Sequence, residues 1–183
     1  MESQLTPGDR LALLAIARDA IRARLAKEPP ARMDVAGTIA RPAAAFVTLR
    51  REVHLRGCIG HLELDRPLAA VVARAAVAAA LEDPRFPPVT PAELDAVSIE
   101  VSVLGPMRRV VNWSAIEVGR HGLIAQSGRA RGLLLPQVAV EWGWNVETFL
   151  GQACLKAGLG ADAWRTGAEV FCFEADVFGE TLA

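Results

Sequence analysis

The sequence predicts an α+β fold with a mixed, largely antiparallel sheet and flanking helices. A helical pattern lies near the N-terminus, and a strictly alternating strand pattern lies near the middle of the chain. Helical and strand patterns do not alternate regularly along the chain, as they would in a doubly wound parallel sheet. The 183 residues suit one domain, and 52% of them are hydrophobic, which is enough to build its core.

The first expected element is a helix that begins at Pro7. Thr6 is a suitable N-cap, proline is favoured at the first helical position, and Asp9 adds a negative charge to the first turn. Apolar residues then recur near the helical period until a pair of prolines stops the helix. Residues 31–43 are expected to form an irregular connector.

A hairpin is expected next, with strands over residues 45–49 and 53–56 joined across residues 50–52. Gly57 and Gly60 follow the second strand. They suggest a bend at which the backbone comes close to another group.

A long alanine-rich helix is expected over residues 67–81, with Asp65 as its cap. The prolines within residues 83–88 then force a rigid, non-helical segment. Residues 90–93, Thr-Pro-Ala-Glu, have the pattern of a capping box, which predicts one short helical turn.

The clearest strand covers residues 97–103, where valine and isoleucine alternate with serine and glutamate. Residues 105–130 are expected to form short strands and loops. Asn145 is placed to cap a helix that ends before Gly158, and residues 169–178 have a weak strand pattern.

Composition and missing motifs exclude several classes of function. Lys and Arg number 20 and Asp and Glu 21, so the net charge of −1 gives no electrostatic footprint for nucleic acid. The chain lacks a P-loop, a dinucleotide fingerprint, a paired-histidine metalloprotease signature, a Cys-x-x-Cys pair and a cysteine cluster for iron and sulfur. No apolar run is long enough to cross a bilayer.

We expect a cytoplasmic protein. Residues 1–4 lack the basic region that opens a secretory signal. The chain has three cysteines, far apart in sequence, and this odd number favours reduced thiols over a disulfide framework.

Cys58 is the main candidate for a functional role. Arg56 or His61 nearby would lower the pKa of its thiol and enrich the thiolate, which attacks electrophiles or binds metals. Gly57 and Gly60 would let a substrate approach the backbone, where exposed amides can bind an anion. The alternative is structural: Cys58 is a small buried hydrophobe at a strand end, and the two glycines mark a bulge.

A metal site is a second hypothesis for the same segment. Cys58 and His61 have a metal-like spacing, and His54 and His121 are possible further ligands. Thiolate and imidazole together would suit zinc, copper or iron. The alternative is an unligated surface histidine.

Residues outside this segment complete the candidate site. Glu100 could act as a base or pair with an arginine, or be an ordinary exposed strand residue. Arg85 fits an anion clamp, but it could equally brace its segment against Asp83 or a backbone carbonyl. His121 places a titratable imidazole beside a turn, and Gln137 could contact a ligand or satisfy backbone groups.

Several short motifs occur in an order that is typical of one family. They are residues 46–49 (FVTL), 55–60 (LRGCIG), 83–86 (DPRF), 99–104 (IEVSVL), 121–123 (HGL), 135–138 (LPQV), 144 (W), 149–150 (FL) and 156–159 (KAGL). On these motifs the chain closely resembles the AMMECR-type domain, in the form called AmmeMemoRadiSam system protein A.

The resemblance implies one domain over residues 1–183, made of two unequal subdomains around an antiparallel sheet. It places residues 55–60 near a groove between the subdomains. It also implies Memo-like and radical-SAM proteins as partners, but it names no activity, substrate or cofactor. Val53 stands where the family is expected to have glycine, which predicts a looser hairpin turn.

Three functions are compatible with these observations. In the first, Cys58 is the nucleophile or redox thiol of an enzyme, and Arg56, Arg85 and Glu100 orient a small anionic or carbonyl substrate. In the second, the protein is a binding or adaptor protein that presents a ligand, metal or peptide to the partners named above. In the third, it carries a metal on Cys58 and His61.

Overall fold

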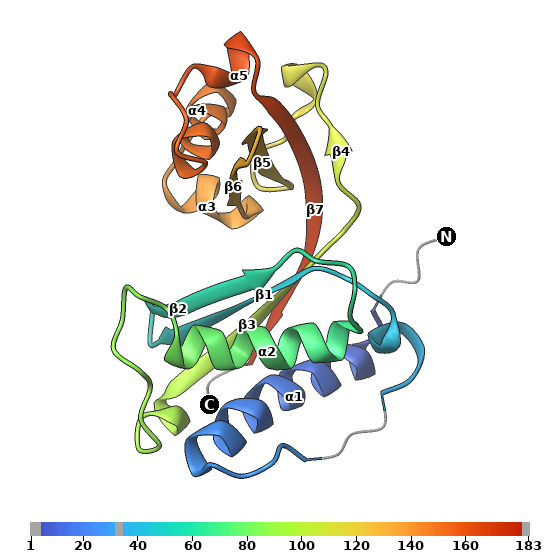
Figure 1. Cartoon of the computed structure of the whole chain (residues 1–183), viewed down its shortest axis with the longest axis vertical. Coiled ribbons are helices and arrows are strands. Elements are labelled where there is room, and N and C mark those ends of the chain that lie inside the picture. The colour runs from blue at the N-terminus through green and yellow to red at the C-terminus, as the bar shows by residue number, and fades with distance from the viewer. Residues whose placement is uncertain (1–4, 32–34, 181–183) are drawn as a thin grey trace. The chain divides into compact units, whose positions relative to one another are not determined.

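The structure, a computed structural model, describes residues 5–31 and 35–180 (Figure 1). The expectation about residues 1–4, and residues 32–34 of the expected connector, lie outside the described part. The chain divides into two unequal units: unit 1 is Met1–Val103 with Asp176–Ala183, and unit 2 is Leu104–Ala175. Both units combine helices with antiparallel strands, which confirms the predicted α+β fold.

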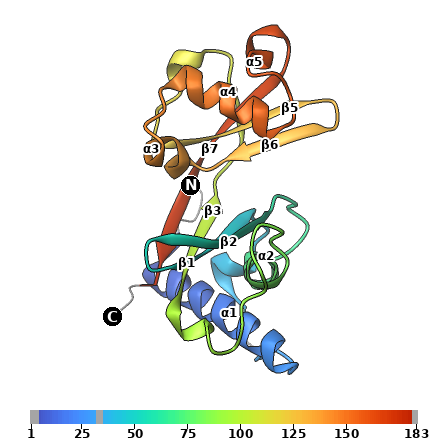
Figure 2. The same ribbon diagram turned by 90° about the vertical axis from the view of Figure 1, so that its left-hand side faces the viewer.

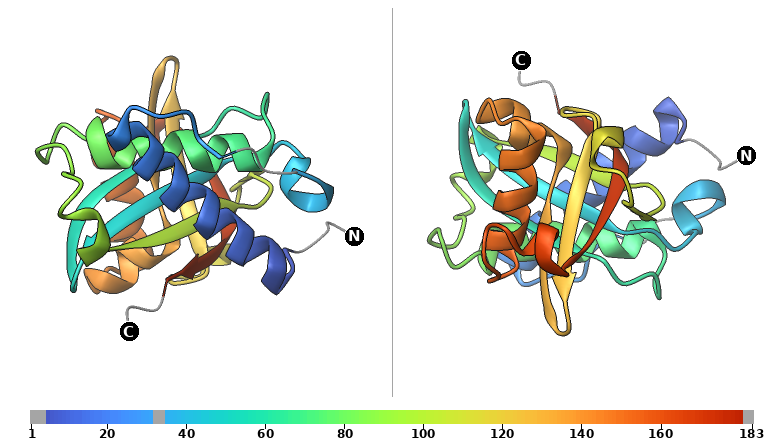
Figure 3. Two further views of the ribbon diagram at one scale, coloured as in Figure 1. Left: turned by 90° about the horizontal axis from the view of Figure 1, so that it is seen from below. Right: turned by 90° about the horizontal axis from the view of Figure 1, so that it is seen from above.

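Unit 1 is built on an antiparallel sheet with two helices on one of its faces. β1 pairs with β2 on one side and with β3 on the other, and the views in Figures 1 and 3 show α1 and α2 lying side by side against this sheet. Apolar side chains of the helices and strands share one core. The elements are α1 (Pro7–Ala26), η1 (Gly37–Ala40), β1 (Ala45–Arg51), β2 (His54–His61), α2 (Leu68–Leu81), η2 (Leu94–Ala96) and β3 (Val97–Leu104).

Unit 2 has its own core, and its strands belong to the same seven-stranded sheet as those of unit 1, in the order β2-β1-β3-β7-β5-β6 with β4 beside β7. β5 pairs with β6 and β7, β4 pairs with β7, and α4 packs on β5 and β6 (Figure 2). Its core includes Phe149, Leu150 and Trp164. The elements are β4 (Arg108–Arg109), η3 (Trp113–Ala115), β5 (His121–Ser127), β6 (Ala130–Leu134), α3 (Pro136–Glu141), α4 (Val146–Lys156), α5 (Ala163–Thr166) and β7 (Glu169–Gly179), of which Asp176–Gly179 belongs to unit 1.

The predicted helix starts that rest on polar caps are confirmed for α1 and α4. Thr6 and Asp9 form a complete capping box, in which the Thr6 hydroxyl accepts from the Asp9 amide at 3.1 Å and the Asp9 carboxylate accepts from the Thr6 amide at 2.9 Å. The Asn145 side chain accepts from the amide of Thr148 at 2.9 Å. α4 ends before Gly158, which has a positive φ of 75°.

The bend predicted at Gly57 and Gly60 is wrong, whereas the close backbone approach predicted there is confirmed at Gly57. Both glycines lie inside β2, which continues to His61, and the irregularity in its pairing comes earlier, opposite Leu49 and Arg50. The glycines are needed for packing instead. A Cβ on Gly57 would lie 2.1 Å from the carbonyl oxygen of Ala79 in α2, because helix and strand approach closely there.

Three smaller predictions about turns and caps are also corrected. The hairpin turn is tight, since Arg51 pairs with His54 and the positive φ falls on Glu52, so no glycine is required at Val53. The N-cap of α2 is Pro67, with no side-chain cap hydrogen bond, in place of Asp65. The short turn after residues 90–93 is η2, whose N-cap Glu93 likewise makes no side-chain cap hydrogen bond.

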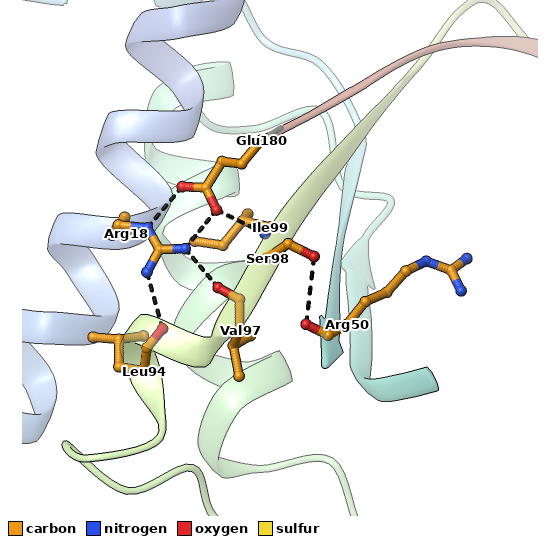
Figure 4. A network of polar contacts seen from close by, with 7 residues as sticks. All are labelled: Arg18, Arg50, Leu94, Val97, Ser98, Ile99 and Glu180. Atoms are coloured by element: carbon orange, nitrogen blue, oxygen red, sulfur yellow. Dashed lines mark hydrogen bonds and ion pairs between the residues drawn. The ribbon is translucent and has the colours of Figure 1, made fainter. Parts of the chain in front are cut away.

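Arg18 of α1 binds Glu180, which follows β7 in the C-terminal segment of unit 1. Its guanidinium binds both carboxylate oxygens of Glu180 and donates to the carbonyls of Leu94 and Val97 at 3.0 and 2.7 Å (Figure 4). Glu180 also accepts from the amide of Ile99 at 2.9 Å. One ion pair therefore joins α1, β3 and the residue that follows β7.

No helix within residues 5–31 and 35–180 is both long enough and apolar enough to cross a membrane.

Candidate functional site

Cys58, Thr48 and Glu100 lie in one row across the sheet of unit 1. In the register of β2, β1 and β3, Thr48 is directly opposite Cys58 on one side and Glu100 on the other. Directly opposed residues of antiparallel strands point to the same face of a sheet. We call these three residues the polar row.

The polar row lies on the sheet face that α1 and α2 do not cover. Val47, Leu49 and Ile99, which alternate with the row along their strands, belong to the core shared with the helices. Ser98 and Ser102 flank Glu100 on β3 and share its face. The sheet thus separates an apolar face, which forms the core, from a face that carries polar groups.

The thiol of Cys58 has a partner within the row. The Thr48 hydroxyl donates to Cys58 Sγ at 3.2 Å. The backbone of Cys58 points the other way, toward the outer edge of β2, because its N–H and C=O bind residues outside the sheet. Cys58 and Thr48 are therefore a non-hydrogen-bonded pair, in which side chains come closest.

Asp83 and Arg85 cover this outer edge of β2. The Asp83 carboxylate accepts from the Cys58 amide at 2.9 Å and from Arg85 Nε and Nη2 at 2.9 and 2.7 Å. Arg85 Nη2 also donates to the Cys58 carbonyl at 3.3 Å. The bracing role predicted as one of two alternatives for Arg85 is the one observed.

The ionised form of Asp83 is strongly favoured. Hydrogen bonds from the Arg85 side chain, followed by those from the amides of Cys58 and Arg85, hold the pKa of Asp83 well below its usual range, against the effect of burial. The charge of Arg85 is therefore balanced by a carboxylate that is only 4% exposed.

Arg56 is paired in the same way. Its guanidinium donates to Glu93 Oε1 at 2.6 Å and to Oε2 at 3.1 Å, and this contact lowers the pKa of Glu93. Phe86 lies 5.9 Å from Arg56 and 5.5 Å from Arg85, measured from each guanidinium carbon to the ring centre. Both arginines that the sequence assigns to an anionic substrate thus have carboxylate partners of their own.

The thiol of Cys58 is not activated by these surroundings. Burial raises its pKa, and the hydrogen bond from Thr48 and the charge of Arg85 oppose this rise without cancelling it. Asp83 and Glu100 add to the rise because their negative charges disfavour a thiolate. Proximity to arginine, which in the sequence predicts a lowered pKa, is outweighed mainly by burial; Arg85 lowers the pKa of the thiol, and its partner Asp83 raises it.

Gly57 and Gly60 both have packing reasons. Gly57 makes room for the backbone of α2, as described above. A Cβ on Gly60 would lie 2.3 Å from the ring of Phe46, its cross-strand partner, so the aromatic ring covers the glycine. Phe46 and Gly60 lie two residues from Thr48 and Cys58 along β1 and β2, so the ring is next to the polar row on the same face of the sheet.

Cys58 and His61 lie on opposite faces of β2. His61 pairs with Ala45 on the helix-facing side of the sheet and, with Val71 and Arg74 of α2, lines a small cavity. In the part of the chain that the structure describes, no three His, Cys, Asp or Glu side chains are grouped to hold a metal. The metal spacing that the sequence suggests is lost because strand residues three apart point to opposite sides.

His121 and Gln137 belong to unit 2. His121 is 7% exposed, and its Nδ1 accepts from the Glu117 amide at 3.0 Å, so it closes the turn that precedes β5. The Oε1 atom of Gln137 is buried and has no hydrogen-bond partner among the described residues. Neither residue is part of the polar row of unit 1.

Unit 2 also has a surface hollow of about 290 Å³ beside α4 and α5. No residue that the sequence singles out for function lines it. Its lining is Glu147, Thr148, Gly151, Gln152, Leu155, Ala161, Asp162, Trp164 and Arg165.

Two oxygens on the polar face have no partner within residues 5–31 and 35–180. Glu100 Oε1 and Ser102 Oγ are buried, and neither has a hydrogen-bond partner among the described residues. Ser102 is only 1% exposed. Its position on the same strand face as Glu100 was a signal in the sequence, whereas nothing in the sequence pointed to Thr48 or to Glu93.

The chain is similar to a known family and to a solved structure. A family model described as AMMECR1 matches residues 14–178. A protein of Thermofilum pendens is 47% identical, over 92% of this chain and 88% of its own length, and one of Methanothermobacter thermautotrophicus is 45% identical over 92% of each. The crystal structure of the uncharacterized protein PH0010 from Pyrococcus horikoshii has a TM-score of 0.86 at 41% identity, over 92% of this chain and 89% of that one.

The family match covers most of the chain, and the relatives are similar along nearly their whole length. The motif order, the α+β fold and these similarities agree. The chain therefore belongs to the AMMECR1 family.

Proposed function

We propose that the protein binds a small ligand on the polar face of unit 1, and that Cys58, Thr48 and Glu100 contact this ligand. The observation that carries the proposal is the register of the three strands, which places a thiol, a hydroxyl and a carboxylate in one row. Structural rows of this kind normally pair their polar groups with each other. Here the carboxylate keeps a buried oxygen for which the described part of the chain supplies no partner.

Binding agrees better with the surroundings of Cys58 than nucleophilic catalysis does. A nucleophilic cysteine needs a thiolate near neutral pH, whereas burial raises the pKa of this thiol. Arg56 and Arg85 are bound to Glu93 and Asp83, so they also give the thiolate little support.

We further propose that the chain acts as system protein A of an AmmeMemoRadiSam system and presents its ligand to a Memo-like or radical-SAM partner. The support for this is the ordered set of motifs in the sequence. In this role Cys58 orients the ligand through a neutral thiol.

Catalysis is the second candidate, and one observation favours it. Glu100 lies in the same row as Cys58, so its carboxylate can take a proton from a ligand held between them. In that case Glu100, rather than Cys58, is the first residue to test for loss of turnover.

The experiment for ligand binding is a thermal-shift screen of a metabolite library. Wild type is compared with Glu100→Gln and with Glu63→Gln, a control at a carboxylate on the same unit whose side chain is 69% exposed. We expect at least one compound to raise the Tm of wild type and of the control but not of Glu100→Gln. A library in which every stabilising compound acts equally on all three proteins contradicts the proposal.

The partner proposal has its own test. The protein is co-expressed with a Memo-like and a radical-SAM protein encoded by the same genome and then purified by affinity. Co-purification of either partner with wild type and with Cys58→Ser supports an adaptor role. Separation of all three proteins at low salt argues against it.

A further inference from the structure

We propose that the ligand of the polar row presents a hydrogen-bond donor, in its simplest form a protonated amine, and is not an anion. This inference rests on the proposed function and names the class of ligand for the same site. It reverses the anionic substrate that the arginines near Cys58 suggest in the sequence.

The first support is the pair of unsatisfied oxygens on the polar face. Glu100 Oε1 can only accept hydrogen bonds when its carboxylate is ionised, and it is buried without a donor among the described residues. A buried acceptor without a donor costs free energy, and more when the group is charged. A donor on the ligand recovers this free energy, whereas a carboxylate or phosphate increases it.

The second support is the direction of the hydrogen bond between Thr48 and Cys58. Thr48 gives its hydroxyl hydrogen to Cys58 Sγ, so the Thr48 oxygen presents only its lone pairs to a ligand. Ser102 Oγ can accept as well. The row and its neighbour therefore offer a carboxylate and two hydroxyl oxygens as acceptors, beside two donors, the Cys58 S–H and the Ser102 O–H.

The third support is that the nearby cations are already bound. Arg85 lies 2.7 Å from Asp83 and Arg56 lies 2.6 Å from Glu93, in both cases from nitrogen to oxygen. Arg50, two residues beyond Thr48 on β1, is engaged in an interaction of its own. An anion that displaced Asp83 or Glu93 would break these contacts, while an ammonium group leaves them intact; Arg56 Nη1 is the one arginine nitrogen here that is buried without a partner among the described residues.

The charge near Cys58 points the same way. The charge of Glu100 raises the pKa of the Cys58 thiol, whereas the charges of Arg85 and Asp83, which bind each other, act on that pKa in opposite directions. Phe46, whose ring covers Gly60 beside Cys58, adds an aromatic surface of the kind that attracts organic cations.

The row also limits the size of the ligand. Neighbouring strands are about 4.8 Å apart, so Cys58 and Glu100, two strands apart, are separated by about 10 Å. An amine with a short carbon chain can bind Glu100 and reach Thr48 and Cys58.

The test is a titration followed by amide NMR on the whole protein, labelled with nitrogen-15. The probes are ethylammonium chloride, acetamide, sodium acetate and sodium phosphate, added at constant pH and ionic strength. We expect ethylammonium to shift the amides of Thr48, Cys58, Glu100 and Ser102 in a saturable way. Acetamide, a neutral donor, should do so more weakly, and acetate and phosphate should leave these amides unshifted.

Variants separate specific binding from a general effect of charge. Glu100→Gln keeps the size of the side chain and is expected to weaken ethylammonium binding about tenfold, because a charge-assisted hydrogen bond is lost. Glu63→Gln, on an exposed carboxylate of the same unit, should leave the affinity unchanged. Equal loss in both variants, or none in Glu100→Gln, overturns the inference.

The remaining outcomes distinguish this inference from the proposed function. Saturable shifts of the row by acetate or phosphate show that the site binds ligands but that the class of ligand is wrong. The absence of any shift with ethylammonium and acetamide also overturns the inference. The proposed function fails only if the thermal-shift screen finds no compound that depends on Glu100.

Discussion

At the scale of single residues, Asp83 links the Cys58 segment to the rest of unit 1. Its carboxylate accepts from Cys58 N at 2.9 Å and makes three further contacts with Arg85. We expect Asp83→Asn to lower the free energy of unfolding by about 2–3 kcal/mol at pH 7, because a buried carboxylate that accepts several hydrogen bonds loses its charge. Urea denaturation measures this loss. Asp162→Asn, at a side chain 86% exposed, is the control and should be nearly neutral.

The same carboxylate predicts a dependence on pH. The pKa of Asp83 is lowered in the folded protein, mainly by Arg85, so its contribution is complete above the unfolded pKa of about 3.9 and is lost as the pH falls through the folded value. The difference in stability between wild type and Asp83→Asn should be equal at pH 7 and pH 5. At pH 3 it should be smaller by about 1 kcal/mol. A difference that grows toward pH 3 contradicts this assignment.

Gly57 gives a steric prediction. Because a Cβ there would lie 2.1 Å from the Ala79 carbonyl oxygen, Gly57→Ala should destabilise the protein by about 2–4 kcal/mol or prevent folding. Gly160→Ala is the matched control, since no atom lies within 4 Å of its added Cβ. Thermal unfolding followed by circular dichroism compares the two variants. Similar Tm values for both would show that α2 and β2 do not approach as closely as described.

The sequence identifies the Cys58 segment as important but not how its residues are used. Gly57, Gly60 and Arg85 stand out as residue types, yet glycine is permissive for many reasons and an arginine has no visible partner in a sequence. The partner of Arg56 is Glu93, 37 residues away, and only the folded chain brings the two together. From the sequence, Arg56 and Arg85 are therefore interpreted as free positive charges, whereas in the structure each is paired with a carboxylate.

At the scale of elements, the ion pair between Arg18 and Glu180 is the clearest stabilising contact. It has two hydrogen bonds between the charged groups, and both side chains are about one-fifth exposed. We expect Glu180→Gln to lower the free energy of unfolding by about 2 kcal/mol, because Arg18 and the Ile99 amide lose a charged acceptor.

The control for this prediction is a surface pair on the same helix. Asp19→Asn breaks the contact with Arg22, whose side chain is 58% exposed, and should cost less than about 0.5 kcal/mol. Urea denaturation of the three proteins gives the comparison. Equal effects of Glu180→Gln and Asp19→Asn would mean that the C-terminal segment is not held by Arg18.

Local chemistry decides which elements the sequence can predict. Capped helices such as α1 and α4, and the alternating strand β3, follow from interactions within a few residues. The bend predicted in β2 is not found. Gly57 is required by the close approach of α2, and Gly60 by the ring of its cross-strand partner Phe46, and neither contact is visible from neighbouring residues in the sequence. Residue preferences show that a glycine suits a position, but they do not show which atom elsewhere in the fold leaves no room for a side chain.

At the scale of the whole molecule, the two units have separate cores and different reporters. All four tryptophans lie in unit 2, whereas α1 and α2, the two longest helices, lie in unit 1. We expect Asp83→Asn to lower the urea midpoint seen by circular dichroism at the helix band and to leave the midpoint seen by tryptophan fluorescence unchanged. Equal shifts in both signals would mean that the units unfold as one.

We propose that Cys58 belongs to a binding site and holds a neutral thiol at physiological pH. The most direct measurement is the rate of Cys58 alkylation in the native protein as a function of pH, with mass spectrometry to separate it from Cys154 and Cys172. We expect an apparent pKa above the free-thiol value of about 8.5 and slow reaction at pH 7, because burial raises the pKa of this thiol. Fast, selective alkylation of Cys58 with an apparent pKa well below that value would contradict it and favour a catalytic thiolate.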